Sequence, residues 1–235
     1  MPSCRPPAKI DGMIALDCAY SNHPISYDVA MDIMDNIVHE IITQNRTNTI
    51  WFLEHHPVYT AGLNALPLDL IAPVFPVYKT DRGGKYTYHG PGQRVVYIMV
   101  DLKQIYHTPD IRDFIVRLES AVIDTLMAFE VQASTQEGMI GIWATHMGQQ
   151  RKLAAIGMRV KKWVTYHGIA INIAPNLSHY SGIIPCGIHD TPMTSLEEMG
   201  CYVPMKQFDD AFIQRFQKAF EFEISSKYEI KGSCS

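Results

Sequence analysis

Hydrophobic residues recur at helical spacing in three stretches of the chain. They do so from Ser26 to Gln44, from Ile111 to Phe129 and from Gln207 to Phe222, and each stretch is predicted to form a helix with one apolar face. Thr108 is the expected N-cap of the middle helix, with Pro109 at its first position.

Other stretches carry the spacing of strands. Ile50 to Leu53 is a run of strand formers that ends before Pro57, and Arg94 to Leu102 is almost continuously apolar, which is typical of a strand buried on both faces in mid-sheet. Three further strands are expected to form an antiparallel portion: Met139 to Trp143, Lys152 to Val160 after the polar segment Thr145 to Arg151, and His167 to Ala174. The predicted fold class is α/β (α+β), a mixed β-sheet flanked by helices.

Composition narrows the class of protein. The chain has 235 residues, 47% of them hydrophobic, which predicts one domain over residues 1–235. Its formal charge of −4 argues against nucleic acid as the main ligand. The uncharged stretch between Lys162 and Asp190 holds too many polar and helix-breaking residues to cross a membrane. Met1 to Asp11 lacks the apolar core of a secretory signal, so a cytoplasmic location is expected.

The densest glycine segment runs from Thr80 to Gln93 and contains four glycines and one proline. Glycine is common where backbone approaches a ligand or takes positive φ, but the same composition also fits a plain hairpin loop. A phosphate loop is poorly supported, because Gly84-Lys85 is followed by Tyr86 instead of Ser or Thr.

The five cysteines form no Cys-x-x-Cys pair, which argues against disulfide scaffolds and zinc knuckles. Cys186 stands between Pro185 and Gly187, in a rigid turn that can present a side chain, although a cysteine in apolar sequence is also commonly a small buried hydrophobe. A nucleophilic thiol needs a nearby cation or histidine to lower its pKa. The candidates are Lys152, His89 and His167, and for Lys152 an exposed strand end is the alternative.

Taken together, these segments resemble the octanoyltransferase family of lipoate biosynthesis. The resemblance is carried by Glu54 to Gly62, Arg82 to Gln93, Lys152 to Gly157, His167-Gly168 and Pro185-Cys-Gly187, with Thr194-Ser-Leu196 trailing. It implies a fold similar to the catalytic domain of biotin and lipoate protein ligases. It also implies transfer of an octanoyl group from octanoyl-acyl carrier protein to a lysine of lipoyl domains, in 2-oxoacid dehydrogenase complexes and in the glycine cleavage H protein, without cofactor or metal.

The resemblance assigns roles residue by residue. Cys186 would carry the acyl chain as a thioester, and Lys152 would favour its thiolate. The residues implied to bind the acyl substrate are Arg82, Gly83, Gly84, Lys85, Tyr86, Thr87, Tyr88, His89, Ala155, Ile156, Gly157, Gly168, Ile169 and Ala170. In the second half-reaction, a Lys152 left neutral by partial desolvation would accept the proton of the attacking amine, because burial disfavours a charged amine.

Two features are open to experiment. A slot walled by Ala155, Gly157, Gly168 and Ala170 predicts that Gly168→Val reduces activity on octanoyl more than on butanoyl substrate. The cluster Arg159 to Trp163 is either a solvated strand end or a docking patch for an acidic carrier protein.

The segment Ala144 to Gln150 is longer than the connection typical of the family, and Gly138-Met-Ile-Gly141 lacks the family's usual proline.

Three alternatives to this function remain. A metal enzyme is disfavoured, because the ten histidines form no His-Glu-x-x-His pattern. An ATP-dependent lipoate or biotin ligase would work through an acyl-adenylate and would not need Cys186. A non-catalytic acyl-binding module would need neither Cys186 nor Lys152. The sequence assigns no role to Cys4, Cys18, Cys201 or Cys234.

Overall fold

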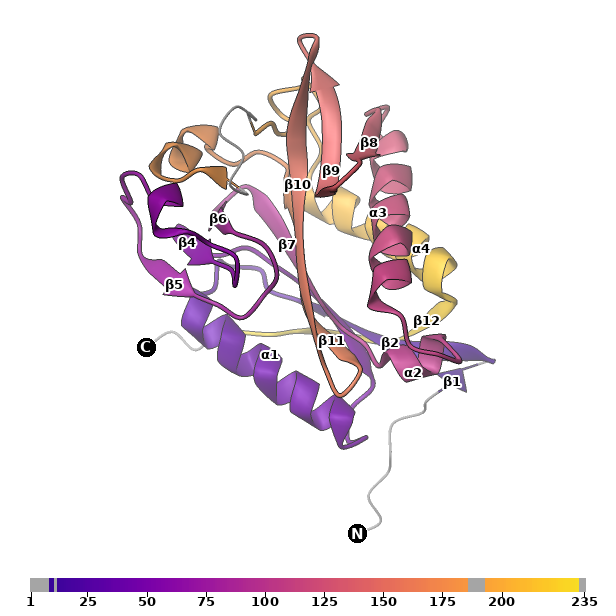
Figure 1. Cartoon of the computed structure of the whole chain (residues 1–235). Helices are drawn as coiled ribbons and strands as arrows, with labels where there is room; N and C mark the ends of the chain where they lie inside the picture. The colour runs from indigo at the N-terminus through magenta and orange to yellow at the C-terminus, as the bar shows by residue number, and fades with distance from the viewer. Residues whose placement is uncertain (1–8, 11, 186–192, 233–235) are drawn as a thin grey trace.

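The computed structural model describes residues 9–10, 12–185 and 193–232. Within them, a nine-stranded sheet runs in the order β1-β2-β3-β7-β11-β10-β9-β8, with β12 also pairing with β2 (Figure 1). The strands are β1 (Lys9–Ile10), β2 (Met13–Tyr20), β3 (Asn48–Leu53), β7 (Gln93–Met99), β8 (Ala133–Gln136), β9 (Met139–His146), β10 (Gln149–Lys161), β11 (Val164–Asn172) and β12 (Phe222–Glu229). A small second sheet has the order β5 (Val77–Lys79), β4 (Val58–Ala61) and β6 (Tyr86–His89).

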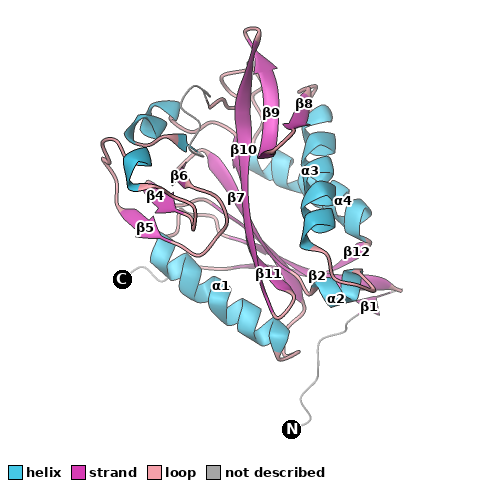
Figure 2. Cartoon of the chain, viewed as in Figure 1, coloured by secondary structure: helices cyan, strands magenta, loops and turns pink. Residues whose placement is uncertain are grey.

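Helices cover both faces of the large sheet (Figure 2). They are α1 (Tyr27–Ile42), α2 (Leu102–Ile105), α3 (Ile111–Met127) and α4 (Met205–Phe220), with short 3-10 turns η1 (Pro67–Asp69) and η2 (Leu177–Gly182). No helix among the described residues is long and apolar enough to span a bilayer.

Strand β7 shows why the sheet needs helices on two sides. Val95 and Tyr97 pack with α1, whereas Val96 and Ile98 pack in the core formed with α3 and α4. Side chains of a strand alternate between faces, so a continuously apolar strand requires cover on both. The sequence-based prediction of a mid-sheet strand buried on both faces is confirmed, as is the mixed sheet: β2 pairs in parallel with β3 and β12, and the other long strands pair antiparallel.

Several details differ from the expectation. The N-cap of α3 is Asp110 and not Thr108: its Oδ1 accepts the backbone N–H groups of Arg112 and Asp113. The segment predicted as a polar connection, Thr145 to Arg151, continues β9 and β10 as a paired ribbon, which turns at Met147 and Gly148, both at positive φ. Strands β1, β2, β8 and β12, helix α2 and the small sheet were not predicted. Most of these elements are short or half-exposed and lack a continuous apolar run, whereas β2 is largely buried and was missed.

Candidate active site

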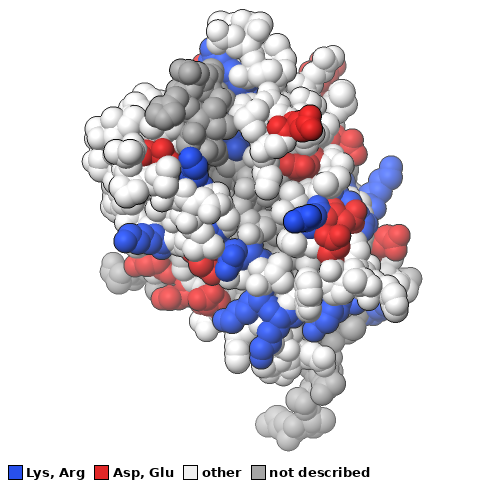
Figure 3. All heavy atoms as spheres, viewed as in Figure 1, with Lys and Arg blue, Asp and Glu red and all other residues white. Residues whose placement is uncertain are grey.

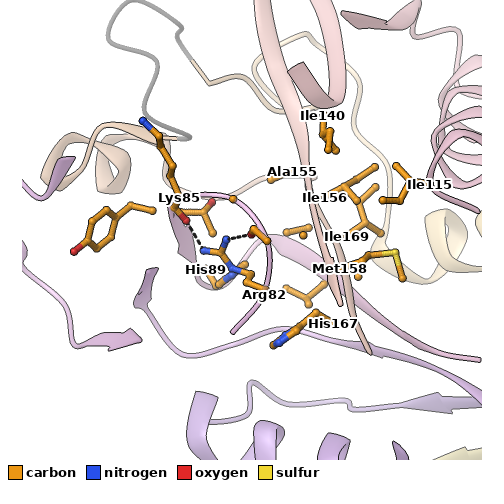
Figure 4. A pocket seen from close by; sticks show the side chains of 18 of the residues that line it. Arg82, Lys85, His89, Ile115, Ile140, Ala155, Ile156, Met158, His167 and Ile169 are labelled. Atoms are coloured by element: carbon orange, nitrogen blue, oxygen red, sulfur yellow. Dashed lines mark hydrogen bonds between the residues drawn. The ribbon is translucent and has the colours of Figure 1, made fainter. Parts of the chain in front are cut away.

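A cavity of about 440 Å³ lies between the glycine-rich segment and strands β10 and β11 (Figure 4). Two cross-strand pairs of small residues form part of its wall, because Ala155 is opposite Ala170 and Gly157 is opposite Gly168. The antiparallel register thus brings together the four small residues that the sequence had placed in one slot. Apolar side chains of Ile115, Ile156 and Ile169 also line the cavity.

Gly168 is needed by the sheet itself. A Cβ atom on Gly168 would lie 2.0 Å from the carbonyl oxygen of Val96 in the neighbouring strand β7, far inside van der Waals contact. Substituting valine there would push β7 and β11 apart before it filled the slot. The expectation that Gly168→Val changes chain-length preference therefore does not follow from this structure, and a different residue must probe the slot.

Arg82 holds the glycine-rich segment in shape. Its Nη1 donates to the carbonyl of Gly83 at 2.9 Å, and its Nη2 donates to the carbonyls of Thr60 (2.8 Å) and Lys85 (2.9 Å). Gly62 leaves space for the Arg82 guanidinium and the backbone of Gly84, since a Cβ atom at position 62 would lie 2.4 Å from the oxygen of Gly84 and 2.8 Å from Nη1 of Arg82. The guanidinium therefore ties the cavity's rim to strand β4.

Of the residues implied to bind substrate, all but Tyr88 line the cavity. The ring of Tyr88 is fully buried behind the wall, and its hydroxyl lies 2.7 Å from Nδ1 of His179 in η2. Lys85 reaches Asp69 of η1, with Nζ 3.6 Å from Oδ2. These contacts join the glycine-rich segment to η1 and η2.

The amine of Lys152 is buried in the cavity wall. The residue is 5% exposed, its Nζ donates to the carbonyl of Ile140 at 2.9 Å, and Nζ lies 5.5 Å from the ring centroid of Trp143. A carbonyl oxygen and an aromatic face both stabilise an ammonium group. The exposed strand end considered for Lys152 is wrong, since the residue is buried beside β9.

Cys186 lies outside the described residues, between Pro185 and Met193. The described chain on either side is anchored close to the cavity. Before it, the N–H of Ile184 donates to the carbonyl of Asp69 at 2.7 Å. After it, Met193 pairs in parallel with Lys152, and the N–H of Thr194 donates to the carbonyl of Lys152 at 3.0 Å. The backbone of Lys152 thus contacts a residue only seven positions after Cys186 in the sequence.

A buried polar network also reaches this part of the chain. The Nε2 group of Gln93 donates to Oδ1 of Asn172 (3.0 Å) and to the hydroxyl of Tyr180 (2.9 Å). Nδ2 of Asn172 in turn donates to the carbonyl of Thr194 at 2.9 Å. The network therefore links the end of the glycine-rich segment to η2 and to the chain that follows Met193.

The two other candidates for activating a thiol are placed differently. His89 is buried, its Nδ1 donates to Oε1 of Gln93 at 2.7 Å, and burial holds its pKa well below the ordinary value. His167 is opposite Met158 on β10, six residues from Lys152 and hence roughly 20 Å along the strand; burial lowers its pKa as well. Lys152 is the only one of the three whose backbone contacts the chain at Met193 and Thr194.

Comparisons with known proteins agree with the resemblance. The family model of the lipoyl protein ligase A/B catalytic domain matches residues 26–217. An octanoyltransferase from Wolbachia pipientis wMel is 45% identical over 200 residues, which cover 85% of this chain and 97% of the relative. One from Rhodospirillum rubrum is 43% identical over 207 residues, covering 87% and 95%. The chain belongs to the octanoyltransferase family.

Solved structures extend the likeness to the fold of the wider family. A bi-partite lipoate protein ligase from Thermoplasma acidophilum superposes with a TM-score of 0.70 at 12% identity, covering 92% of this chain and 88% of that one. A biotin protein ligase from Aquifex aeolicus superposes with a TM-score of 0.52 at 12% identity, covering 87% and 68%. The expected resemblance to the catalytic domain of biotin and lipoate ligases is confirmed, as is membership of this acyltransferase family.

Several residues of the octanoyltransferase cavity were missed by sequence reasoning. Tyr27 comes from α1, Tyr97 from β7 and Ile115 from α3, and in sequence each looks like an ordinary core residue. Outside the cavity lining, Glu119 was missed too. It is a 9% exposed carboxylate on the apolar side of α3, and a charged residue at such a position was the signal available in the sequence. The described residues contain no cluster of three or more metal-ligating side chains; both nitrogens of His55 lie within hydrogen-bond distance of protein oxygens, of Ile25 (2.9 Å) and Tyr97 (2.7 Å).

Proposed function

We propose that this chain transfers an octanoyl group from octanoyl-acyl carrier protein to a lysine of a lipoyl domain through a thioester on Cys186. The observation that carries the proposal is the buried amine of Lys152 in the wall of a partly apolar cavity, on a residue whose backbone contacts Met193 and Thr194. A cation placed there would favour a thiolate on a cysteine brought close to it.

The first half-reaction forms the acyl-enzyme. The thiolate of Cys186 attacks the thioester carbonyl of the carrier, the new C–S bond forms, and the C–S bond to the carrier breaks. The ammonium of Lys152 gives its proton to the departing carrier thiolate, so the carrier leaves as a thiol and Lys152 becomes a neutral amine. Exchange between two thioesters of similar energy needs neither ATP nor a metal.

The second half-reaction restores the starting state. The neutral ε-amine of the acceptor lysine attacks the thioester carbonyl, the N–C bond forms, and the C–S bond to Cys186 breaks. Lys152 takes the proton that the acceptor nitrogen must lose, which regenerates an ammonium beside a thiolate. One amine thus acts as acid in the first step and base in the second.

The cavity suits the acyl chain by its size and lining. Each methylene moved from water into apolar surroundings is worth about 0.8 kcal/mol, so the six methylenes of an octanoyl chain supply roughly 5 kcal/mol of binding. The small side chains of Ala155, Gly157 and Ala170 leave room for that chain against the strands. The proposed acceptors are the lipoyl domains of 2-oxoacid dehydrogenase complexes and the glycine cleavage H protein.

The location of the basic cluster favours one of its two interpretations. Arg159 and Lys161 lie at the end of β10 and Lys162 in the turn to β11, and basic side chains gather over this lower part of the face in Figure 3. Lys161 is nine residues from Lys152, roughly 30 Å along the strand. A carrier docked at the turn would have to deliver its thioester over that length, so we favour a solvated strand end.

Turnover of octanoyl-acyl carrier protein with an apo lipoyl domain tests the proposal. The variants Cys186→Ala and Lys152→Met are each expected to turn over at least a hundredfold more slowly than the wild type. Cys201 is a free cysteine outside the cavity, so Cys201→Ala is expected to keep wild-type activity. Full turnover by Cys186→Ala contradicts the proposal. A requirement for ATP with free octanoate as donor would instead support the ligase alternative.

A further inference from the structure

Glu119 lies one peptide group away from Lys152. Glu119 is 9% exposed, and its Oε1 accepts a hydrogen bond from the backbone N–H of Gly141 at 3.1 Å. The carbonyl on the other side of that same peptide, from Ile140, accepts Nζ of Lys152 at 2.9 Å. The peptide therefore bridges a buried amine and a buried carboxylate, with its N–H toward the acid and its C=O toward the base.

Gly141 makes this bridge possible. Its φ is +124°, a conformation that residues with a side chain rarely adopt. A Cβ atom there would lie 2.6 Å from Cε of Lys152, 3.2 Å from its Nζ and 2.6 Å from the oxygen of Ala154. Without a side chain, the backbone at Gly141 comes directly against the lysine amine while its N–H stays aimed at α3.

Hydrogen bonds in a chain polarise one another, and the effect grows where one member is charged and water is excluded. A carboxylate bonded to the N–H makes the carbonyl of the same peptide a stronger acceptor for the hydrogen bond from Nζ of Lys152. Burial raises the pKa of Glu119, and the hydrogen bond from Gly141 and the charge of Lys152 both oppose that rise.

We infer that Glu119 is a positioning residue for the reaction, which holds the Ile140–Gly141 peptide against Lys152 and biases its amine toward the protonated form. This inference rests on the proposed role of Lys152. It assigns a task to a buried carboxylate that the two half-reactions do not otherwise use.

Other charged groups near the cavity form ion pairs of their own or belong to the glycine-rich segment. Lys85 faces Asp69, and Arg151, next to Lys152 in sequence, pairs with Glu198 at 3.4 Å. Arg82 and His89 line the cavity from the glycine-rich segment. Among the described residues, Glu119 is the acidic side chain hydrogen bonded to the peptide that contacts the Lys152 amine.

The test is the pH dependence of kcat/KM for octanoyl-acyl carrier protein in Glu119→Gln. Glutamine keeps an oxygen that accepts from Gly141 but removes the charge. The lost negative potential lets both the thiol and the ammonium give up protons more easily. Both limbs of the profile are therefore expected to move to lower pH, and the alkaline limb by about one pH unit, the size expected for unit charges several ångströms apart at a partly buried site.

Asp124→Asn is the matched control, because it removes the same charge from an exposed position of the same helix. Its profile is expected to match the wild type. The inference is overturned if Glu119→Gln leaves both limbs in place, or if Asp124→Asn moves them equally. The pH dependence of Cys186 alkylation by iodoacetamide, read by mass and normalised to folded protein, gives the same comparison if Glu119→Gln is less stable. Wild-type turnover by Lys152→Met would instead defeat the proposed function, which is a separate outcome.

Discussion

Replacing Gly168 with alanine tests whether the small residues of β10 and β11 serve the sheet or the substrate. The added Cβ would lie 2.0 Å from the carbonyl oxygen of Val96, so β11 and β7 must separate at the point where Gly168 pairs with Tyr97. Overpacking typically costs 1–3 kcal/mol, and a clash between two backbones belongs at the upper end, about 3 kcal/mol. For a chain of this size that corresponds to a fall in Tm of about 6–12 °C.

Thermal unfolding of Gly168→Ala and Gly83→Ala, followed by circular dichroism, makes the comparison. Gly83 lines the same cavity, but a Cβ atom there meets only the oxygen of Met158, at an ordinary 3.6 Å. Gly83→Ala is therefore expected to keep the wild-type Tm. Equal Tm values for Gly168→Ala and the wild type would refute the reasoning, as would a loss of activity by Gly168→Ala on octanoyl but not on butanoyl substrate at a temperature where the variant is folded.

Three other perturbations follow from the same structure. Ala155→Leu, which fills the cavity without a strained backbone, is expected to lower kcat/KM for octanoyl at least tenfold more than for butanoyl carrier, because about two methylenes lose their burial; parallel losses on both substrates argue against an acyl slot at Ala155. Lys161→Glu combined with Lys162→Glu is expected to leave KM for the carrier unchanged at low salt, and a clear rise in KM would place docking at the β10–β11 turn. Burial lowers the pKa of His55 from 6.5 to about 4, so the folded state resists protonation of this residue. As the pH falls from 6.5 toward 4, His55 becomes protonated in the unfolded state first, and the free energy of unfolding therefore decreases by about 3 kcal/mol. Urea unfolding of His55→Gln should show a correspondingly smaller loss of unfolding free energy between pH 6.5 and 4 than the wild type, and identical pH dependence would count against a neutral buried His55.

The elements predicted from sequence are those whose burial leaves a strong pattern. Alternate residues of strand β7 face α1, the residues between them face α3 and α4, and both sets are apolar. The sequence of β7 therefore predicts burial on both faces. Strand β12 is half exposed at the sheet's edge and carries Ser225, Ser226 and Lys227, so its pairing with β2 leaves no such pattern. Register across strands is a tertiary property, and the sequence did not show that Gly168 faces the backbone of β7.

Some residues of the candidate site could likewise be predicted from the sequence, and others could not. The glycine-rich segment was singled out by its glycine content and Lys152 as one of three candidates for activating a thiol. The family resemblance then gave both a role, and in the structure both line one cavity. Glu119 belongs to no such motif and looks like one more polar residue of an amphipathic helix. Its relation to Lys152 depends on the approach of α3 to β9 and on the unusual backbone of Gly141. Such contacts arise only when elements distant in sequence are packed together.

The central claim is that the octanoyl chain rests covalently on Cys186 midway through transfer. Intact and peptide mass spectrometry after mixing the protein with octanoyl-acyl carrier protein tests this most directly. The account predicts a mass increase of one octanoyl group, located on the peptide containing Cys186, which disappears when an apo lipoyl domain is added and appears on that domain's lysine. Octanoylation of the lipoyl domain by Cys186→Ala at the wild-type rate, with no adduct on the protein, would contradict it.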